Sequence, residues 1–333
     1  MKSRLFAGAL CLAAMAPAIA EAAPFAYITN QGSHDVSVID LASQKVVALV
    51  PVGRSPAGVV AVSRTGRVFV SNPDSKTISV IDMRQQKVVA TLAAGDGPVG
   101  IDATADGRYL YAADWYRNRL LVFDTRAVAA YSDSVASAPT LPVASIDVGK
   151  APAGVAASDR AGTVFVAERD DSVALVDVVT RQVRARAKVG SHPFALLFDT
   201  PRQRLYALNV KSDDVSVIDT REPNRLDVIA TVKVGKAPYG AALTADGALL
   251  YVTNQHDDSV SVIDAESLKL LRTLSGFGYP EGVAAHADRV YVVNWMDDNV
   301  SVLDARSGVA LGLIATGKNS RGFGAFIGAP AYP

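Results

Sequence analysis

Residues beside a set of regularly spaced prolines are the strongest candidates for binding chemistry in this sequence. The prolines are Pro56, Pro98, Pro152, Pro193, Pro238 and Pro280, and Ser320 occupies the equivalent place near the end of the chain. The residues that follow are small in the first three cases and mostly aromatic or charged afterwards: Ala57, Val99, Ala153, Phe194, Tyr239, Glu281 and Arg321. The residues that precede show the same bias: Ser55, Gly97, Ala151, His192, Ala237, Tyr279 and Asn319.

Aromatic and charged side chains that converge at the end of a channel are typical of a ligand site. The predicted ligand-binding set is His192, Phe194, Tyr239, Tyr279, Glu281, Trp295 and Arg321. Nearby departures from the repeated pattern are Trp115, Gln255 and His256. Structural roles are the alternative, because such clustering is only indirect evidence of function. Glu281 and Arg321 can pair with each other. Phe194 and Tyr239 can plug the channel, and His192 can cap a turn.

Four basic residues at a second equivalent position predict a local positive potential that favours an anionic partner. This basic rim consists of Arg54, Lys150, Lys236 and Lys318. Aspartates in neighbouring turns could neutralise it: Asp170, Asp171, Asp213, Asp214, Asp257, Asp258, Asp297 and Asp298. These carboxylates resemble metal ligands, but their recurrence favours turn formation, since Asp bonds its own backbone in tight turns.

Familiar catalytic signatures are missing from the sequence, which has no HExxH, GxSxG, paired cysteines or EF-hand loop. An enzyme remains the alternative, with Glu281 and His192 as acid and base, and a divalent metal would belong to this alternative alone. The histidines fall in different repeats, so no metal site is predicted and no cofactor is expected; they are His34, His192, His256 and His286.

These residues sit in a framework of seven repeats. An acidic residue ends one strand of each, at Asp40, Asp82, Asp124, Asp177, Asp219, Asp264 and Asp304, spaced 40 to 53 residues apart. The strands before it read VSVID, ISVID, LLVFD, VALVD, VSVID, VSVID and VSVLD, and their partners read like LYVTN. Alternation at period two indicates half-buried strands. Seven aspartates in one repeated place are structural, because a catalytic group is not needed seven times.

Each repeat adds a third strand and a small-residue strand that opens at the proline, which makes four antiparallel strands. Four short strands per ~40 to 45 residues is the spacing of a propeller blade. The first repeat begins at FAYITN without its small-residue strand, and RGFGAFIG at 321–328 is such a strand without followers. The sequence therefore predicts an all-β, seven-bladed propeller in which the C-terminal strand completes the first blade and removes exposed edges.

One repeat carries extra residues between its last two strands. The insertion at 126–143, in the third repeat, is rich in Ala, Ser and Pro. A surface loop is the favoured interpretation and a partner-docking loop the alternative.

The LYVTN and VSVID pair, the VGKAP turn and the ADG turn resemble the YVTN-repeat β-propellers, which include YncE-like periplasmic proteins. The resemblance covers essentially the whole chain after the leader and implies a fold, because propellers host binding, scaffolding and catalysis alike. The leading interpretation is a monomeric, non-enzymatic binding or scaffold protein, with a small anionic or aromatic ligand or a protein partner at the channel mouth. The alternatives are a lactonase-like or lyase-like enzyme and an accessory protein for a periplasmic quinoprotein or haem redox enzyme. No CxxCH exists for covalent haem.

The N-terminal segment predicts export. Lys2 and Arg4 precede an apolar run and small residues, so residues 1–22 read as a secretory signal cleaved after Ala20 or Ala22. Cys11 is the only cysteine and lies in that signal, so residues 23–333 would form one thiol-free periplasmic domain. The run is too short to span a membrane. Zero formal charge argues against a general nucleic-acid binder.

Overall fold

The computed structural model describes residues 24–129 and 140–330. The predicted signal at 1–22, with Cys11 and both cleavage points, and the middle of the insertion lie outside the described residues. In the described part, no helix is long and apolar enough to cross a membrane.

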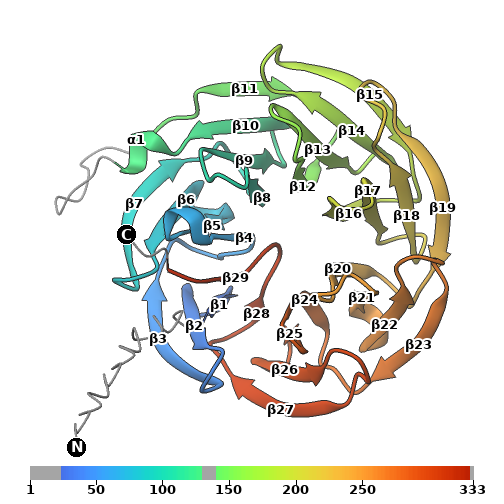
Figure 1. Ribbon diagram of the computed structural model, residues 1–333. Helices are drawn as coiled ribbons and strands as arrows, with labels where there is room; N and C mark the ends of the chain where they lie inside the picture. The colour runs from blue at the N-terminus through green and yellow to red at the C-terminus, as the bar shows by residue number, and fades with distance from the viewer. Residues whose placement is uncertain (1–23, 130–139, 331–333) are drawn as a thin grey trace, which may run out of the picture.

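Seven sheets are arranged around a central axis like the blades of a propeller (Figure 1). The first three blades contain β1 (Phe25–Asn30), β2 (Asp35–Asp40) and β3 (Lys45–Pro51); β4 (Val59–Val62), β5 (Arg67–Asn72), β6 (Thr77–Asp82) and β7 (Lys87–Ala93); and β8 (Pro98–Ala103), β9 (Tyr109–Asp114), β10 (Arg119–Asp124) and β11 (Ala144–Asp147). A short helix, α1 (Arg126–Ala129), begins the insertion between β10 and β11.

The other four blades have the same strand order. They contain β12 (Pro152–Ala157), β13 (Thr163–Glu168), β14 (Ser172–Asp177) and β15 (Gln182–Lys188); β16 (Pro193–Asp199), β17 (Arg204–Asn209), β18 (Asp214–Asp219) and β19 (Asp227–Lys233); β20 (Pro238–Leu243), β21 (Leu249–Asn254), β22 (Ser259–Asp264) and β23 (Leu270–Ser275); and β24 (Pro280–His286), β25 (Arg289–Asn294), β26 (Asn299–Asp304) and β27 (Ala310–Ala315). The seven-bladed propeller of four-stranded antiparallel blades is confirmed.

The hydrophobic core lies between neighbouring blades. One aromatic ring from the second strand of each blade is at most 1% exposed: Tyr27, Phe69, Tyr111, Phe165, Tyr206, Tyr251 and Tyr291. These rings occupy the same place in each YVTN-type strand, so the period-two pattern directs them all into the spaces between sheets. Burying large rings in this way supplies much of the apolar contact that holds the blades together.

The C-terminal segment closes the ring, as predicted. In β28 (Ser320–Arg321), Ser320 pairs with Asn30 of β1, and in β29 (Ile327–Gly328), Gly328 pairs with Phe25. Between them the chain turns to the second blade, where the N–H of Val59 donates to the carbonyl of Phe323 (2.9 Å). Gly324 makes this possible, since its φ is +126° and a Cβ would overlap the carbonyl oxygen of Val59. The closing segment therefore joins the first and second blades.

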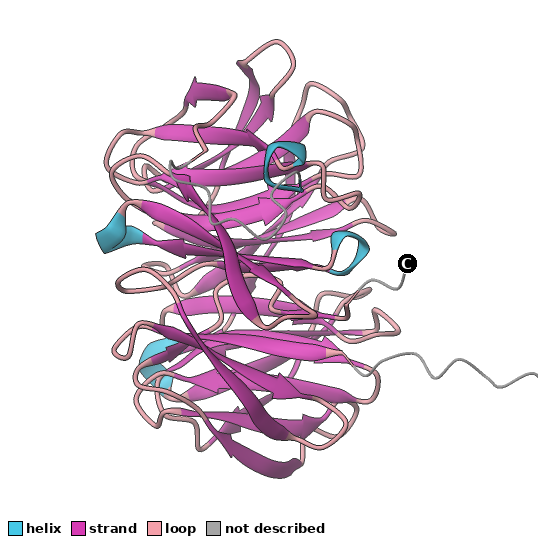
Figure 2. Ribbon diagram, turned by 90° about the vertical axis from the view of Figure 1, so that its left-hand side faces the viewer, coloured by secondary structure: helices cyan, strands magenta, loops and turns pink. Residues whose placement is uncertain are grey.

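Turns gather on two faces of the disc, and the strands cross between them (Figure 2). We call the face that carries the turns before the prolines and the turns after the YVTN-type strands the proline face. On the opposite face, each terminal aspartate caps the next turn. The N–H of Ser43 donates to Asp40 Oδ1 (2.7 Å), for example, and that of Ser267 to Asp264 Oδ1 (2.7 Å). These contacts support the structural role predicted for the repeated aspartates.

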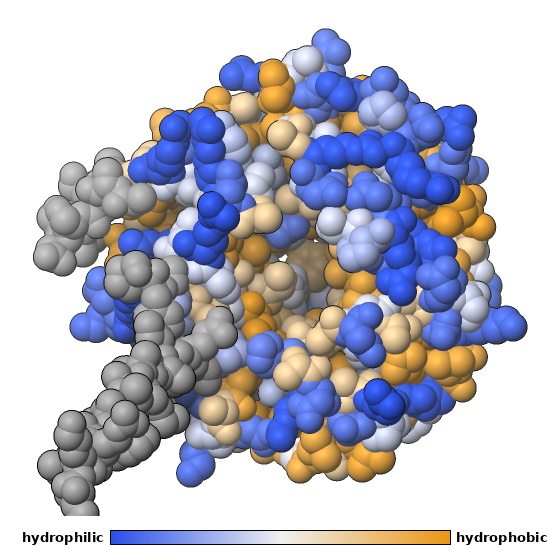
Figure 3. All heavy atoms as spheres, in the orientation of Figure 1, coloured by the Kyte–Doolittle hydropathy of each residue, from blue (hydrophilic) through white to orange (hydrophobic). Residues whose placement is uncertain are grey.

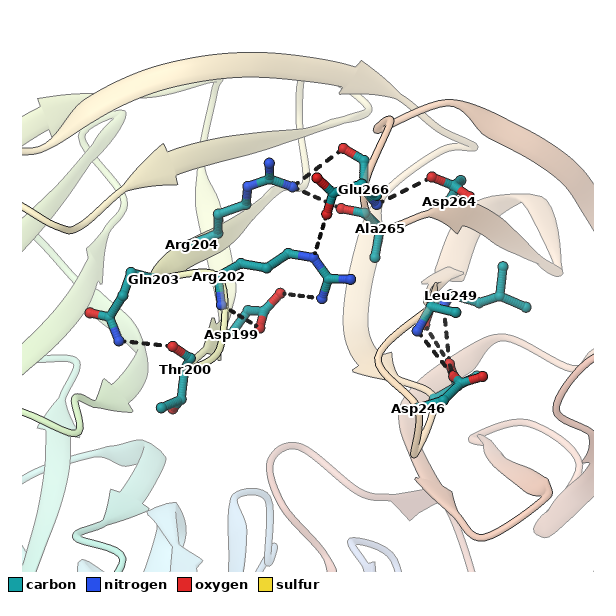
Figure 4. Close-up of polar contacts among 12 residues, drawn as sticks. Asp199, Thr200, Arg202, Gln203, Arg204, Asp246, Leu249, Asp264, Ala265 and Glu266 are labelled. Atoms are coloured by element: carbon teal, nitrogen blue, oxygen red, sulfur yellow. Dashed lines mark hydrogen bonds and ion pairs between the residues drawn. The ribbon is translucent and has the colours of Figure 1, made fainter.

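Ion pairs on the opposite face also join neighbouring blades (Figure 4). The buried carboxylate of Asp199 accepts from Arg202 Nη1 (3.1 Å), and Arg202 Nε reaches Glu266 of the next blade (3.0 Å). Arg204 Nη1 donates to the carbonyl of Ala265 (2.9 Å). This face therefore fixes the angle between the fifth and sixth blades.

Ring closure can be tested at Phe326, which is fully buried in the core of the first blade. Truncation in F326A leaves a cavity beside the closing segment, so we expect the free energy of unfolding to fall by about 3–5 kcal/mol in denaturant titrations. Leu313 on the outer strand is 70% exposed, and L313A should change it by no more than about 0.5 kcal/mol. Equal losses in the two variants would contradict closure by this segment.

Candidate functional site

The predicted ligand-binding residues fall into three groups on the proline face. Phe194 and Tyr239 belong to an aromatic cluster beside His192. Glu281, which is buried, and Arg321, which is half-buried, form an ion pair. Tyr279 and Trp295 lie together in a second aromatic group, whose rings are 5.5 Å apart.

The aromatic cluster brings together rings from four blades. Phe194 lies 4.5 Å from Tyr239 and 4.9 Å from Phe323, between ring centroids. Trp115 approaches Phe194 from the third-blade turn at 6.4 Å. The spacing of these rings is within the range of favourable aromatic contacts. Tyr239 and Phe323 are buried, so the inner part of the cluster is packed away from solvent.

The outer side of this cluster forms a small pocket. This aromatic pocket encloses about 170 Å³ and is lined by Trp115, Arg169, His192, Pro193, Phe194, Val210, Lys211 and Tyr239. The guanidinium of Arg169 lies 5.2 Å from the centroid of the Trp115 ring, which is within cation–π range. Arg169 and Lys211 are both exposed. The pocket therefore combines flat apolar walls with positive charge.

His192 stands in a strained turn at the edge of the pocket. Its φ is +57°, and its N–H donates to Asp171 Oδ1 (2.8 Å). The ring Nδ1 lies 3.0 Å from Ser191 Oγ. Asp171, not the imidazole of His192, therefore caps the turn. The side chain of His192 is 38% exposed, so its imidazole can reach a ligand.

The same backbone geometry recurs at other prolines. Asp213, Asp258 and Asp298 accept the N–H groups of Ala237 (2.9 Å), Tyr279 (2.9 Å) and Asn319 (2.6 Å), which also have positive φ. These contacts support the interpretation of the aspartates as turn formers. Among the described residues, no three His, Cys, Asp or Glu side chains are grouped to hold a metal ion.

Glu281 and Arg321 pair beneath the mouth. Arg321 Nε lies 3.1 Å from Glu281 Oε2, and Gln255 Nε2 donates to Glu281 Oε1 (2.7 Å). Burial raises the pKa of Glu281 to about 7, while the Arg321 guanidinium and the Gln255 amide oppose the rise. His192 contacts Ser191 and Asp171 instead. The two residues of the predicted acid–base alternative therefore have separate partners.

The second aromatic group is more open to solvent. His256 Nε2 lies 2.9 Å from the Tyr279 hydroxyl, and Trp295 Nε1 donates to Gln31 Oε1 (3.2 Å). His256 is exposed, whereas Tyr279 and Trp295 are half-buried. This group can extend a binding surface along the proline face.

The basic rim residues Arg54, Lys150, Lys236 and Lys318 are all exposed on the same face. Arg54 Nη2 donates to the carbonyl of Asp74 (3.0 Å), and Lys236 Nζ lies 4.0 Å from Asp257. The predicted neutralisation by turn aspartates is thus present at Lys236. Exposed pairs of this kind contribute little to stability.

Sequence comparison of the repeats missed four residues at this site, namely Gln31, Arg169, Lys211 and Phe323. Arg169 and Gln31 occupy the same position after their strands as Trp115 and Trp295, so comparing every blade at that position would have found them. Phe323 was missed because its strand departs from the regular pattern of inner strands.

The region from 141 to 330, more than half of the chain, matches the family model described as YNCE-like beta-propeller. The chain belongs to the YNCE-like beta-propeller family. Residues 21–145 of this YNCE-like chain match a second model, the cytochrome D1 heme domain. None of the curated proteins compared with it matches.

Several solved structures share the fold of this YNCE-like protein. Hydrazine synthase of Kuenenia stuttgartiensis is 19% identical, with a TM-score of 0.70 over 88% of this chain and 99% of that one. A functionally unknown protein of Desulfotomaculum acetoxidans is 15% identical, with a TM-score of 0.75 over 92% and 99%. The dihydro-heme d1 dehydrogenase NirN in complex with DHE is 16% identical, with a TM-score of 0.67 over 93% and 77%.

The buried ion pair of this YNCE-like propeller predicts a specific pH dependence. Between pH 4.5 and about 7, folded Glu281 keeps a proton that the unfolded chain has released. Its contribution to the free energy of unfolding therefore falls as pH rises through this window. Gln cannot titrate, so E281Q lacks this contribution. In denaturant titrations, the free energy of unfolding of wild type minus that of E281Q should therefore fall between pH 4.5 and 7.

The exposed carboxylate of Glu222 supplies the control for this measurement, since it has no buried partner. E222Q shows how much of any change follows from losing a surface carboxylate, and the pH dependence attributed to Glu281 should exceed it. A flat difference for E281Q would contradict a raised pKa at Glu281.

Proposed function

We propose that this protein is a binding protein whose proline face holds a planar, anionic ligand in the aromatic pocket. The observation that carries the proposal is the placement of Arg169 and Lys211 beside the rings of Trp115, Phe194 and Tyr239. Flat rings favour stacking with a conjugated ligand, and the two cations favour carboxylates on its edge.

A tetrapyrrole is the ligand class that best combines these properties. The match of residues 21–145 to the cytochrome D1 heme domain supports this class, and so does the fold shared with dihydro-heme d1 dehydrogenase NirN in complex with DHE. In this chain, Trp115 and Phe194 would stack on the ring, and Arg169 and Lys211 would pair with its carboxylates. The imidazole of His192 would offer a nitrogen to a central metal.

The size of the pocket limits how such a ligand would bind. About 170 Å³ is less than the 300–1,000 Å³ typical of enclosed ligand sites, so the pocket can enclose only one edge of a macrocycle. An exposed ligand suits a protein that carries or presents a tetrapyrrole to a redox enzyme. That role matches the accessory alternative drawn from the sequence.

Titrations with hemin and with metal-free protoporphyrin test the ligand class. We expect a shift of the hemin absorbance band and quenching of Trp fluorescence by both compounds. Substitutions R169A and F194A should each weaken binding of both about tenfold, equivalent to about 1.4 kcal/mol. The control K45A removes an exposed cation on outer strand β3 and should leave both affinities unchanged.

The role of His192 has its own outcome in the same experiment. H192A should weaken hemin binding and spare protoporphyrin, because only hemin carries a metal for the imidazole. Failure of wild type to bind either compound would exclude the tetrapyrrole, and equal losses in R169A and K45A would exclude the aromatic pocket.

We also propose that the protein is exported to the periplasm, on the strength of the N-terminal charge and hydropathy pattern. N-terminal sequencing of protein recovered from the periplasm of an expressing bacterium should begin at Glu21 or Ala23. Retention of Met1 in that fraction would contradict cleavage.

A further inference from the structure

A larger cavity occupies the channel on the other side of the aromatic cluster. This axial cavity has a volume of about 460 Å³ and is bounded by inner strands β8, β12, β16, β20 and β24 and by residues 322–325. Figure 3 shows the channel opening at the centre of the disc. Phe323 lines the cavity and also stacks on Phe194, so the cluster separates the cavity from the aromatic pocket.

The side chains that line the axial cavity are apolar apart from Asp102 and Thr200, and backbone polar groups of the inner strands make up part of its surface. Glycine, alanine, valine, leucine, isoleucine and phenylalanine make up most of the lining, and Thr200 adds a hydroxyl. Asp102 is the one charged residue among those that line it. A volume in this range, with few polar side chains, is typical of a small-molecule site.

Asp102 departs from the repeat at a place that apolar residues fill in other blades. In the second to seventh blades, the residue paired across the sheet with the buried aromatic residue is, in chain order, Val60, Asp102, Ala156, Leu197, Ala242 or Ala284. The fold therefore does not need a carboxylate here. A charge placed on an otherwise apolar wall is costly unless something pairs with it.

The carboxylate of Asp102 retains capacity for a ligand. Oδ2 accepts from the N–H of Ala157 (2.8 Å) and Oδ1 from the N–H of Ala103 (2.8 Å). A carboxylate has about four acceptor sites, so roughly two stay available. No basic side chain is among the residues that line the cavity. Burial raises the pKa of Asp102 to about 6, against the two backbone bonds.

We propose that the axial cavity binds a small organic cation, with its ammonium group on Asp102 and its apolar body against the inner strands. This second site is independent of the proposed tetrapyrrole site. An ammonium supplies the counter-charge that the protein does not, and the small residues of the inner strands leave room for an aryl or alkyl group.

Three probes of similar size test the charge preference by calorimetry or ligand-detected NMR: 2-phenylethylammonium, 2-phenylethanol and phenylacetate. The cation should bind tightest and the anion weakest. In D102N the cation should lose at least tenfold in affinity while the alcohol is unchanged. The control D147N changes an exposed carboxylate on β11 and should keep the wild-type order.

Two further measurements place the site and do not depend on the folding of D102N. Filling the cavity in A285L should abolish binding of cation and alcohol while hemin binding persists. In wild type, cation affinity should fall as pH drops below about 6, because Asp102 takes up a proton. The titratable group opposite Asp102 is the Tyr111 hydroxyl of β9, and β12 presents only Ala156 and Ala157.

The proposal would be overturned if wild type bound the three probes with equal affinity. It would also be overturned if wild type and D102N bound the cation equally well. Absence of binding by any probe would do so too. If A285L weakened binding of hemin and left binding of the cation and the alcohol unchanged, the cavity would belong to the tetrapyrrole site instead.

Discussion

Close approach of the inner strands is the constraint on which the rest of this propeller depends. At one position in five blades the residue is glycine, and a Cβ there would overlap backbone of the neighbouring inner strand: Gly58, Gly100, Gly154, Gly240 and Gly282. The fifth blade has Ala195 instead. Phe194, the residue before it, contacts Tyr239 of the next blade, so the aromatic cluster lies where alanine replaces the repeated glycine.

Most acidic side chains of the proline face hydrogen-bond to backbone groups of its turns. Asp171, Asp213, Asp258 and Asp298 hold backbone N–H groups in left-handed turns, where non-glycine residues are otherwise disfavoured. Their carboxylates therefore serve the backbone and are poor candidates for ligands or metals. The remaining candidates for ligand contacts on this face are the few positions where the blades differ from one another. They are chiefly Trp115, Arg169 and the residues beside Pro193.

The sequence was sufficient for the architecture because each strand repeats one simple pattern. Alternating apolar residues placed Tyr27 and Tyr251 between blades, and the incomplete ends of the repeat predicted closure. The site was harder, because a repeat alignment shows which residues share a face but not their depth. Glu281 and Arg321 were expected at an open mouth, yet Glu281 is fully buried. Asp102 was not predicted, because a single acidic residue in a small-residue strand produces no periodic signal in the sequence.

The closing segment also brings together residues that lie far apart in the sequence. The hydroxyl of Ser320 meets Asn30 across 290 residues of chain, so the first blade stays incomplete until almost all of the polypeptide is available. Contacts this distant in sequence slow folding, because a very long loop must close before they form. A nascent chain of this design cannot finish its disc while still emerging from the ribosome.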